Sequence, residues 1–471
     1  MISPSLHPQP VKATCEPVGR FAFGLTPRAI GLFVIGLLLA LPGFFDARLG
    51  YGMLLWDALV ATAIFWDGQR LPAPQQIELE RSWNNAPSLN SETEIELGVL
   101  QQGTTILDCR LVDDLPEALV ERPGTHSLRA FPGIRAALRY RIVPRERGDA
   151  KAGSLFVRYS SRLGLVERRA KAPLGEPVRV YPALRQGENQ QIFLARARQI
   201  DVQLRRMRQR GLGRDFESLR EYREGDDLRD VCWTATARRG LLITRQFETE
   251  RSQAVWIVLD AGRLLQSRVL PDVSTKGTDQ GAWGQSKLDH ACSTAVALAQ
   301  LALFAGDRVG LLVYGQQVQQ RVLPARGAAH LRNLIEALAQ ARAESSEADH
   351  LRATATLDRL QPQRAMILWI TDLAETAMRP EVIDGAIQLL HRHVLLFVSM
   401  AQPDVQAIAS EMPRNVQQMF RASAAQELTS RRELLLARLR EQGALTLDQD
   451  PNQLTAAVLN QYLKVKERAM V

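Results

Sequence analysis

The chain has few cysteines and lacks the motifs of several common enzyme classes. Its four cysteines, Cys15, Cys109, Cys232 and Cys292, contain no CxxC pair. This argues against a disulfide framework or a zinc site and suits a reducing compartment. The phosphate-binding pattern GxxxxGK[ST] is absent, so the chain is not itself a P-loop ATPase. None of the seven histidines belongs to a nucleophile or metal-ligand motif; we expect them at helix caps or on the surface, and we expect no enzymatic activity.

The net charge of the chain is +8, but most of its basic residues are interspersed with acidic ones. The 59 Lys and Arg residues are spread among 51 Asp and Glu residues, so no dedicated nucleic-acid groove is expected. Gln190–Arg210 is the most basic segment, and its pattern predicts a helix that includes Arg205, Arg206 and Arg208. This helix leaves one alternative open, a nucleic-acid or anionic-lipid binding module at the membrane surface.

Two apolar runs stand near the start of the chain. Ala29–Phe45 is uncharged, and Leu49–Trp66 contains a single acid, Asp57. Each is near the minimum of roughly 17–25 residues that a transmembrane helix needs. Because only Asp46–Arg48 separates them, residues 29–66 predict a transmembrane helical hairpin. An acid inside a span is a functional hypothesis by default, and the role of Asp57 stays open.

Basic residues flank the predicted hairpin on both sides and give its orientation. They are Lys12, Arg20 and Arg28 before the first span, and Arg70 and Arg81 after the second. The positive-inside rule then places both termini and the main domains in the cytoplasm. The sequence therefore predicts a multi-pass protein of the inner membrane, with residues 1–28 as a cytoplasmic N-terminal segment.

Residues 75–182 predict a small β-sandwich. Short alternating segments recur there between clusters of Gly, Pro, Asn and Asp, which is typical of strands in such a domain. The predicted strands are Gln76–Trp83, Thr93–Leu100, Thr105–Leu111, Ala136–Val143, Ser154–Tyr159 and Glu176–Tyr181. No catalytic cluster is visible among them, so we expect a docking module or a spacer.

Residues 252–471 alternate between apolar strands and amphipathic helices, which predicts a doubly wound parallel sheet. The predicted strands are Val255–Leu259, Arg308–Tyr314, Ala365–Ile370, Val394–Met400 and Ala444–Leu447. The predicted helices are Ser286–Phe304, Leu331–Ala341, Pro380–His391, Val416–Gly443 with an internal break, and Asn452–Arg468. Asp260 and Asp372 each follow a predicted strand, where ligands of such folds bind.

Residues 186–251 link these two regions and carry Gly213–Glu250, which is dense in charge of both signs. Asp215–Glu221 favours an amphipathic turn with ion pairs three and four residues apart. Trp233 and Ala235–Ala237 give this segment apolar surface to bury, and Leu241–Phe247 then alternates like a strand. Most such charge runs are solvated loops, but the central tryptophan indicates a recognition surface.

The run Leu219–Arg229 (LREYREGDDLR), followed by Trp233 and Ala237–Arg238, resembles the signature of the DUF58 family. These are membrane-anchored bacterial and archaeal proteins with a von Willebrand factor A-like domain. The resemblance implies an α/β von Willebrand A-like doubly wound sheet, preceded by a small β-sandwich and an N-terminal transmembrane helical hairpin. We call residues 252–471 the A-like domain.

The resemblance also implies a partner, a MoxR-type AAA+ ATPase acting in the assembly or maturation of complexes. The expected function is that of an inner-membrane-anchored scaffold or adaptor, whose A-like domain binds protein partners, including unknown clients. The signature segment is the candidate partner-binding surface. Its candidate residues are Arg220, Tyr222, Gly225, Asp226, Asp227, Arg229, Trp233 and Arg238.

Von Willebrand A domains bind Mg²⁺ or Mn²⁺ through a DxSxS motif, a loop threonine and a later aspartate. The resemblance assigns these positions to Asp260, Gly262, Leu264, the Gly-Ala-Ala run at 327–329, and Asp372. Three of the five positions therefore carry no side-chain oxygen. We expect a degenerate site and no cofactor, with the two aspartates paired to backbone amides or to an arginine such as Arg263.

Overall fold

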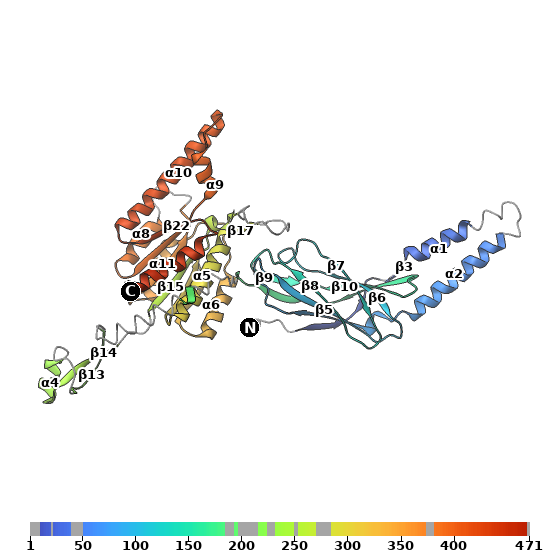
Figure 1. Ribbon diagram of the computed structural model, residues 1–471, viewed down its shortest axis with the longest axis horizontal. Coiled ribbons are helices and arrows are strands. Elements are labelled where there is room, and N and C mark those ends of the chain that lie inside the picture. The colour runs from blue at the N-terminus through green and yellow to red at the C-terminus, as the bar shows by residue number, and fades with distance from the viewer. Residues whose placement is uncertain are drawn as a thin grey trace. The chain divides into compact units, whose positions relative to one another are not determined.

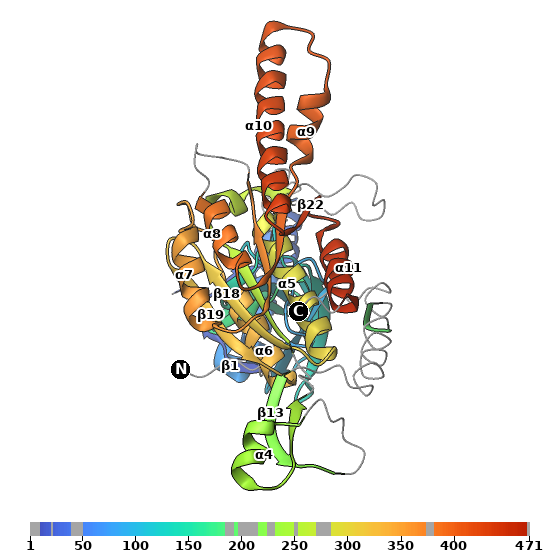
Figure 2. The same cartoon turned by 90° about the vertical axis from the view of Figure 1, so that its left-hand side faces the viewer.

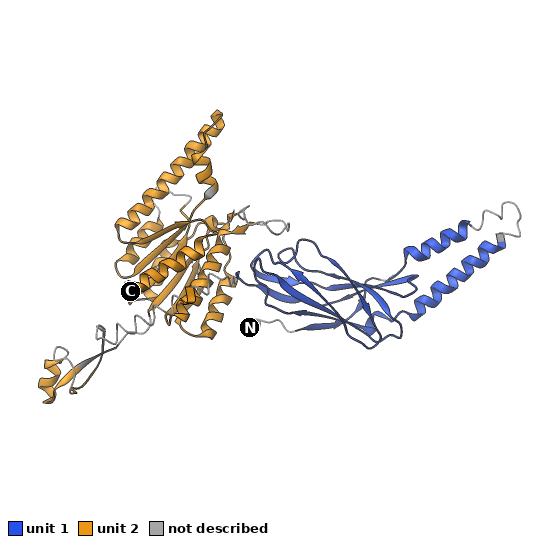
Figure 3. Ribbon diagram, in the orientation of Figure 1, with its two compact units in different colours: residues 1–183 blue, residues 184–471 orange. Residues whose placement is uncertain are grey.

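A computed structural model gives the structure of the protein. It describes residues 10–19, 22–38, 50–183, 193–195, 215–223, 231–248, 253–269, 284–373 and 381–468. The chain divides into two compact units, Met1–Ala183 and Leu184–Val471 (Figure 3).

The first unit is built around two antiparallel sheets that share one apolar core. One sheet has the order β1-β4-β5-β8 (Val11–Thr14, Ile77–Trp83, Thr93–Gln101, Ala136–Ile142). The other has the order β2-β11-β10-β6-β7 (Glu16–Pro17, Val166–Ala172, Leu155–Ser161, Leu107–Asp113, Thr125–Ala130), and β3 (Phe23–Leu25) also pairs with β11. β9 (Gly148–Ala152) pairs with β12 (Glu176–Val180). Alternate residues of β4, β6 and β10 point into this core.

Three strands of this unit precede the helices and were not predicted. β1 pairs with β4, whereas β2 and β3 pair with β11. These strands contain four, two and three residues, too few to show a period of two in the sequence. The N-terminal segment therefore contributes to the β-structure rather than only preceding the apolar runs.

A buried arginine connects the two sheets of the first unit. Arg81 of β4 is fully buried and pairs with the carboxylate of Asp113 at the end of β6. Tyr140 donates its hydroxyl to the same carboxylate at 2.6 Å. Arg81 also donates to the backbone oxygens of Leu174 and Gly153. A buried charge is tolerated when it is paired and hydrogen-bonded in this way.

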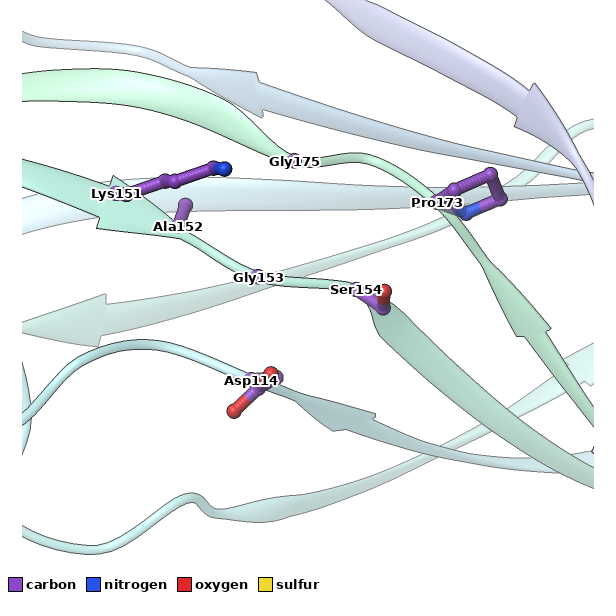
Figure 4. A pocket seen from close by; sticks show the side chains of 7 residues that line it. All are labelled: Asp114, Lys151, Ala152, Gly153, Ser154, Pro173 and Gly175. Atoms are coloured by element: carbon purple, nitrogen blue, oxygen red, sulfur yellow. The ribbon is translucent and has the colours of Figure 1, made fainter.

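A surface hollow of about 500 Å³ lies in the first unit (Figure 4). Asp114, Lys151, Gly153 and Ser154 contribute to its lining. Its lining side chains include one acid, one amine and one hydroxyl.

Helix α1 (Pro27–Leu38) covers the described part of the first apolar run, and α2 (Gly50–Arg70) covers the described part of the second; residues 39–49 lie outside the described ranges. Trp56 of α2 donates its indole N–H to the Leu32 oxygen of α1 at 3.0 Å. Among the residues with described positions, no helix combines the length and the apolar character that a membrane span needs. The predicted transmembrane hairpin is thus not found, and its turn at 46–48 falls outside the described residues. One carboxylate oxygen of Asp57 is buried without a hydrogen-bond partner in the described part of the chain.

The C-terminal end of α2 is fixed to the β-structure. Asp67 is fully buried and accepts hydrogen bonds from the amides of Leu165 and Val166, both at 3.1 Å. Arg168 of β11 donates to the Gly68 oxygen at 3.2 Å. The direction in which α2 leaves the β-structure is therefore set by buried, charge-assisted hydrogen bonds.

The second unit contains a sheet with the order β19-β18-β15-β20-β21-β22 (Figure 1). The strands are Val318–Ala325, Arg308–Tyr314, Ala254–Asp260, Met366–Thr371, Val394–Met400 and Leu445–Gln449. All neighbouring strands run parallel except β18 and β19. Numbered along the domain, this order is 3-2-1-4-5-6, which is a doubly wound topology. The predicted doubly wound sheet is confirmed, but the antiparallel edge strand β19 was missed.

Helices cover both faces of this sheet (Figures 1 and 2). On one side lie α5 (Lys287–Phe304), α6 (Ala328–Gln340) and α11 (Leu454–Glu467). On the other side, α7 (His350–Leu360), α8 (Glu381–Leu390) and α10 (Val416–Glu441) pack over Trp256, Trp369 and Phe397. Helix α10 is continuous, so the predicted break within it is wrong. It packs along α9 (Pro403–Ser410), and neither α7 nor α9 was predicted.

The signature segment forms a hairpin rather than the predicted amphipathic turn. β13 (Asp215–Glu221) pairs antiparallel with β14 (Ile243–Glu248). Between them, α4 (Trp233–Arg239) ends at Gly240, whose φ of 69° suits the left-handed helix cap. The strand was missed because its partner lies beyond the reach of local ion-pair rules.

Candidate functional site

The candidate site lies at the carboxyl edge of the A-like sheet, between β15 and β20. These strands are neighbours, and the chain winds away from them in opposite directions. Such a switch point leaves a crevice at which ligands of doubly wound folds bind. Asp260 ends β15, while Thr371 ends β20 and Asp372 follows it, so the two predicted carboxylates flank this point.

Both carboxylate oxygens of Asp260 are engaged by the chain itself. The Gly262 amide donates to Oδ1 at 2.7 Å, and the Thr371 hydroxyl donates to Oδ2 at 2.6 Å. Burial raises the pKa of Asp260 above its ordinary value, and the nearby imidazole of His350 opposes that rise. The carboxyl is thus held by one local hydrogen bond from a backbone amide, as expected from the sequence, and by one from the neighbouring strand β20.

Asp372 is held by two cations that the sequence analysis did not identify. The ammonium of Lys287, at the start of α5, pairs with Oδ2, and the guanidinium of Arg432, on α10, donates to Oδ1 at 3.0 Å. Gln402 also donates to Oδ2, at 3.3 Å. The predicted arginine, Arg263, instead lies near Glu347 at 3.5 Å in an exposed pair.

Arg432 connects three strand ends at once. Besides Asp372 after β20, it donates to the Ser399 hydroxyl and the Met400 oxygen of β21, at 2.7 and 2.5 Å. It pairs with Asp448 of β22 at 2.6 Å. The carboxylates of Asp372 and Asp448 raise its pKa against the opposing effect of burial, so this side chain stays charged.

The residues at this edge do not fit the divalent ion that the fold resemblance implies. Gly262 and Leu264 offer no side-chain oxygen, and hard cations require oxygen ligands. The run at 327–329 opens helix α6, with Gly327 as its N-cap at a φ of 92°. The two cations beside Asp372 oppose a metal ion by charge. Across the described ranges there is no cluster of three or more His, Cys, Asp or Glu residues able to hold a metal.

A hydrogen-bonded aromatic chain lies beside Asp260. The Trp369 indole donates to the Tyr314 hydroxyl at 2.7 Å, and that hydroxyl meets Nδ1 of His350 at 2.9 Å. Burial raises the pKa of Tyr314 well above its ordinary value, so the phenol stays neutral. Burial likewise lowers the pKa of His350, against the attraction of Asp260.

The prediction that the histidines lie at caps or on the surface is wrong for two of them. His330 is buried, and its Nε2 lies 2.6 Å from the Val309 oxygen. His393 is buried 4.0 Å from the Asp358 carboxylate. No sequence motif marks either position.

The signature residues are only partly described. Arg220 lies near the end of β13 and Tyr222 directly follows that strand, while Trp233 and Arg238 lie on α4. Gly225, Asp226, Asp227 and Arg229 fall outside the described residues, as do Arg205, Arg206 and Arg208 of the basic segment.

The sequence predicted that Trp233 would be buried, but 66% of its surface is exposed to solvent. Leu241 and Leu242, after α4, are 58% and 44% exposed. Together with the exposed Arg238, these residues form what we call the signature surface.

The profile of the family described as "Protein of unknown function DUF58" matches residues 218–413. The match supports the predicted family for this part of the chain, which begins within β13 and ends before α10, β22 and α11.

Two similar proteins are uncharacterized. YeaD of Bacillus subtilis is 28% identical over 153 residues, which is 31% of this chain and 38% of YeaD. Rv1480 of Mycobacterium tuberculosis is 28% identical over 198 residues, 41% of this chain and 56% of that protein. The chain thus spans about two fifths of the length of YeaD and somewhat over half of that of Rv1480.

Among solved structures, the conserved hypothetical protein BatB from Bacteroides thetaiotaomicron is similar at 14% identity. The alignment covers 45% of this chain and 98% of BatB, with a TM-score of 0.29. At that score the fold assignment rests on the strand order and not on this likeness.

Proposed function

We propose that the protein is an inner-membrane-anchored adaptor, without catalytic activity, that works with a MoxR-type AAA+ ATPase. The observation that carries the proposal is the exposed signature surface. Tryptophan and arginine are the residue types that most often dominate the energy of protein interfaces. An exposed Trp233 beside Leu241 and Leu242 leaves apolar surface that a docked partner would cover.

The exposed apolar side chains of α1 and α2 support the anchoring part of the proposal. On α1, Val34 is 52% and Leu37 64% exposed; on α2, Leu55 is 73% and Phe65 69% exposed. Large apolar side chains gathered at such exposure are costly in water. A bilayer would cover them, and the fixed C-terminal end of α2 would carry the β-structure beside the membrane.

Fractionation of cells tests the anchoring. We expect the full-length chain in the membrane fraction, retained at high salt and in alkaline carbonate, and released by detergent. Release by salt alone would instead favour a peripheral module that binds anionic lipid electrostatically. Recovery in the soluble fraction would contradict the anchoring.

Capture from a lysate of the source organism tests the partner. The detergent-solubilised full chain should retain a AAA+ ATPase, and Trp233→Ala should lose it. Leu323→Ala is the matched control, because Leu323 is 57% exposed on β19, outside the signature surface. Equal capture of the ATPase by the wild-type, Trp233→Ala and Leu323→Ala chains would show that the signature surface is not the docking site. Capture of nucleic acid alone, lost in high salt, would favour the binding-module alternative.

A further inference from the structure

At the carboxyl edge of the A-like sheet, Gly262 and Leu264 lack the side-chain oxygens that a metal ion would need. The same edge holds two buried cations that were not predicted, Lys287 and Arg432. The side chain of Asp372 is fully buried, that of Lys287 is 5% exposed, and that of Arg432 is 9% exposed. A buried carboxylate without a counter-charge is strongly unfavourable. In a metal-binding domain a divalent ion would provide that charge, whereas here the chain provides it twice.

The two cations reach Asp372 from different helices. Lys287 is the first residue of α5, which begins at a capping box between Ser286 and Asp289. Arg432 comes from the middle of α10. Their combined charge of two equals that of one divalent ion, and both end on the carboxylate that the family resemblance assigns to the metal. The other carboxylate, Asp260, is satisfied by Gly262 and Thr371.

We infer that Lys287 and Arg432 are resident cations that replace the divalent ion of this fold. The A-like domain therefore holds its carboxyl edge together without metal, and any partner that docks there does so independently of divalent ions. Lys287 also closes the position from which a metal would otherwise contact Asp372. This inference does not depend on the membrane anchor or on the ATPase.

Thermal unfolding and Mn²⁺ binding of the full-length chain test the inference. We expect the wild-type midpoint to be the same in chelator and in millimolar Mn²⁺. Lys287→Ala removes one cation and uncovers an oxygen of Asp372. We expect this variant to unfold at a lower temperature, to be partly restored by Mn²⁺, and to bind Mn²⁺ at least about tenfold more tightly than the wild type.

Lys466→Ala is the matched control in the same domain. Lys466 of α11 is also buried and pairs with Asp307 at 2.9 Å, before the start of β18, at the opposite edge of the sheet from Asp372. Its removal should lower the midpoint without any response to Mn²⁺. The inference is overturned if Lys287→Ala behaves in the same way, or if wild-type protein binds Mn²⁺ and loses it with Asp372→Asn.

Asp372→Asn separates the two accounts even if Lys287→Ala does not fold. When cations reside at the edge, neutralising Asp372 leaves Lys287 buried without the carboxylate it pairs with, while Arg432 keeps Asp448, and the midpoint falls. When the edge is a vacant metal site, the same change relieves repulsion with Asp260, and the midpoint rises. A rise would overturn the inference.

Discussion

Arg432→Met should destabilise the A-like domain far more than Arg431→Met. Of the partners of Arg432, Asp372 keeps Lys287, and Asp448 is 25% exposed and regains water. The Ser399 hydroxyl, fully buried, and the Met400 oxygen lose their charged donor. Breaking a buried pair costs about 3–5 kcal/mol. Because Asp372 remains paired, we expect the lower end, about 3 kcal/mol.

Arg431→Met is the control. Arg431 forms an exposed pair with Glu427 four residues earlier, with side chains 56% and 59% exposed. Such a pair contributes about 0.3–0.5 kcal/mol. Hydrogen exchange of the Ile257 and Leu368 amides, in the buried strands β15 and β20, reports the free energy of unfolding of this domain within the full chain. If Arg432→Met costs no more than Arg431→Met, the reasoning about the buried network is refuted.

Two further predictions concern buried titratable groups. Burial lowers the pKa of His393 in the folded chain. As pH falls below the ordinary histidine value of about 6.5, the unfolded state takes up a proton that the folded state does not, and stability is lost until the lower folded pKa is passed. His393→Phe should therefore flatten the fall in thermal midpoint between about pH 7.5 and 5.5, and the same change at the exposed His391 should not. Burial raises the pKa of Cys15 and Cys109 to about 12, and all four cysteines are buried. Thiol reagents should therefore label the native chain slowly and the unfolded chain quickly. Rapid native labelling of Cys15, Cys109 or Cys292 would contradict the packing of the two units.

The interior of the A-like sheet could be predicted from the sequence because its strands are buried on both faces. All residues of β15 are buried, and a short apolar run ending in a carboxylate signals such a strand. The edge strand β19 is half exposed, with polar residues and Pro324 in its course, so its pattern resembles a loop. β13 was missed for a related reason, since its hydrogen bonds go to a distant segment.

Only part of the candidate site at the carboxyl edge of the A-like sheet could be predicted from the sequence. Asp260 and Asp372 were found because strand ends meet at one edge of a parallel sheet, a rule that needs no knowledge of side-chain contacts. Lys287 and Arg432 were not found because they lie 85 and 60 residues from Asp372 and sit on helices of ordinary composition. The exposure of Trp233 was equally hidden, since a tryptophan between small residues favours burial.

The most direct test of the adaptor proposal is the dissociation constant between the full-length chain, held in lipid nanodiscs, and the purified MoxR-type ATPase of the same organism. We expect specific binding that is unchanged by chelator. Trp233→Ala should weaken it by about 30-fold, the equivalent of a 2 kcal/mol hot spot, while Leu323→Ala leaves it unchanged. Absence of binding by the wild-type chain, or equal affinity of Trp233→Ala, would contradict the account.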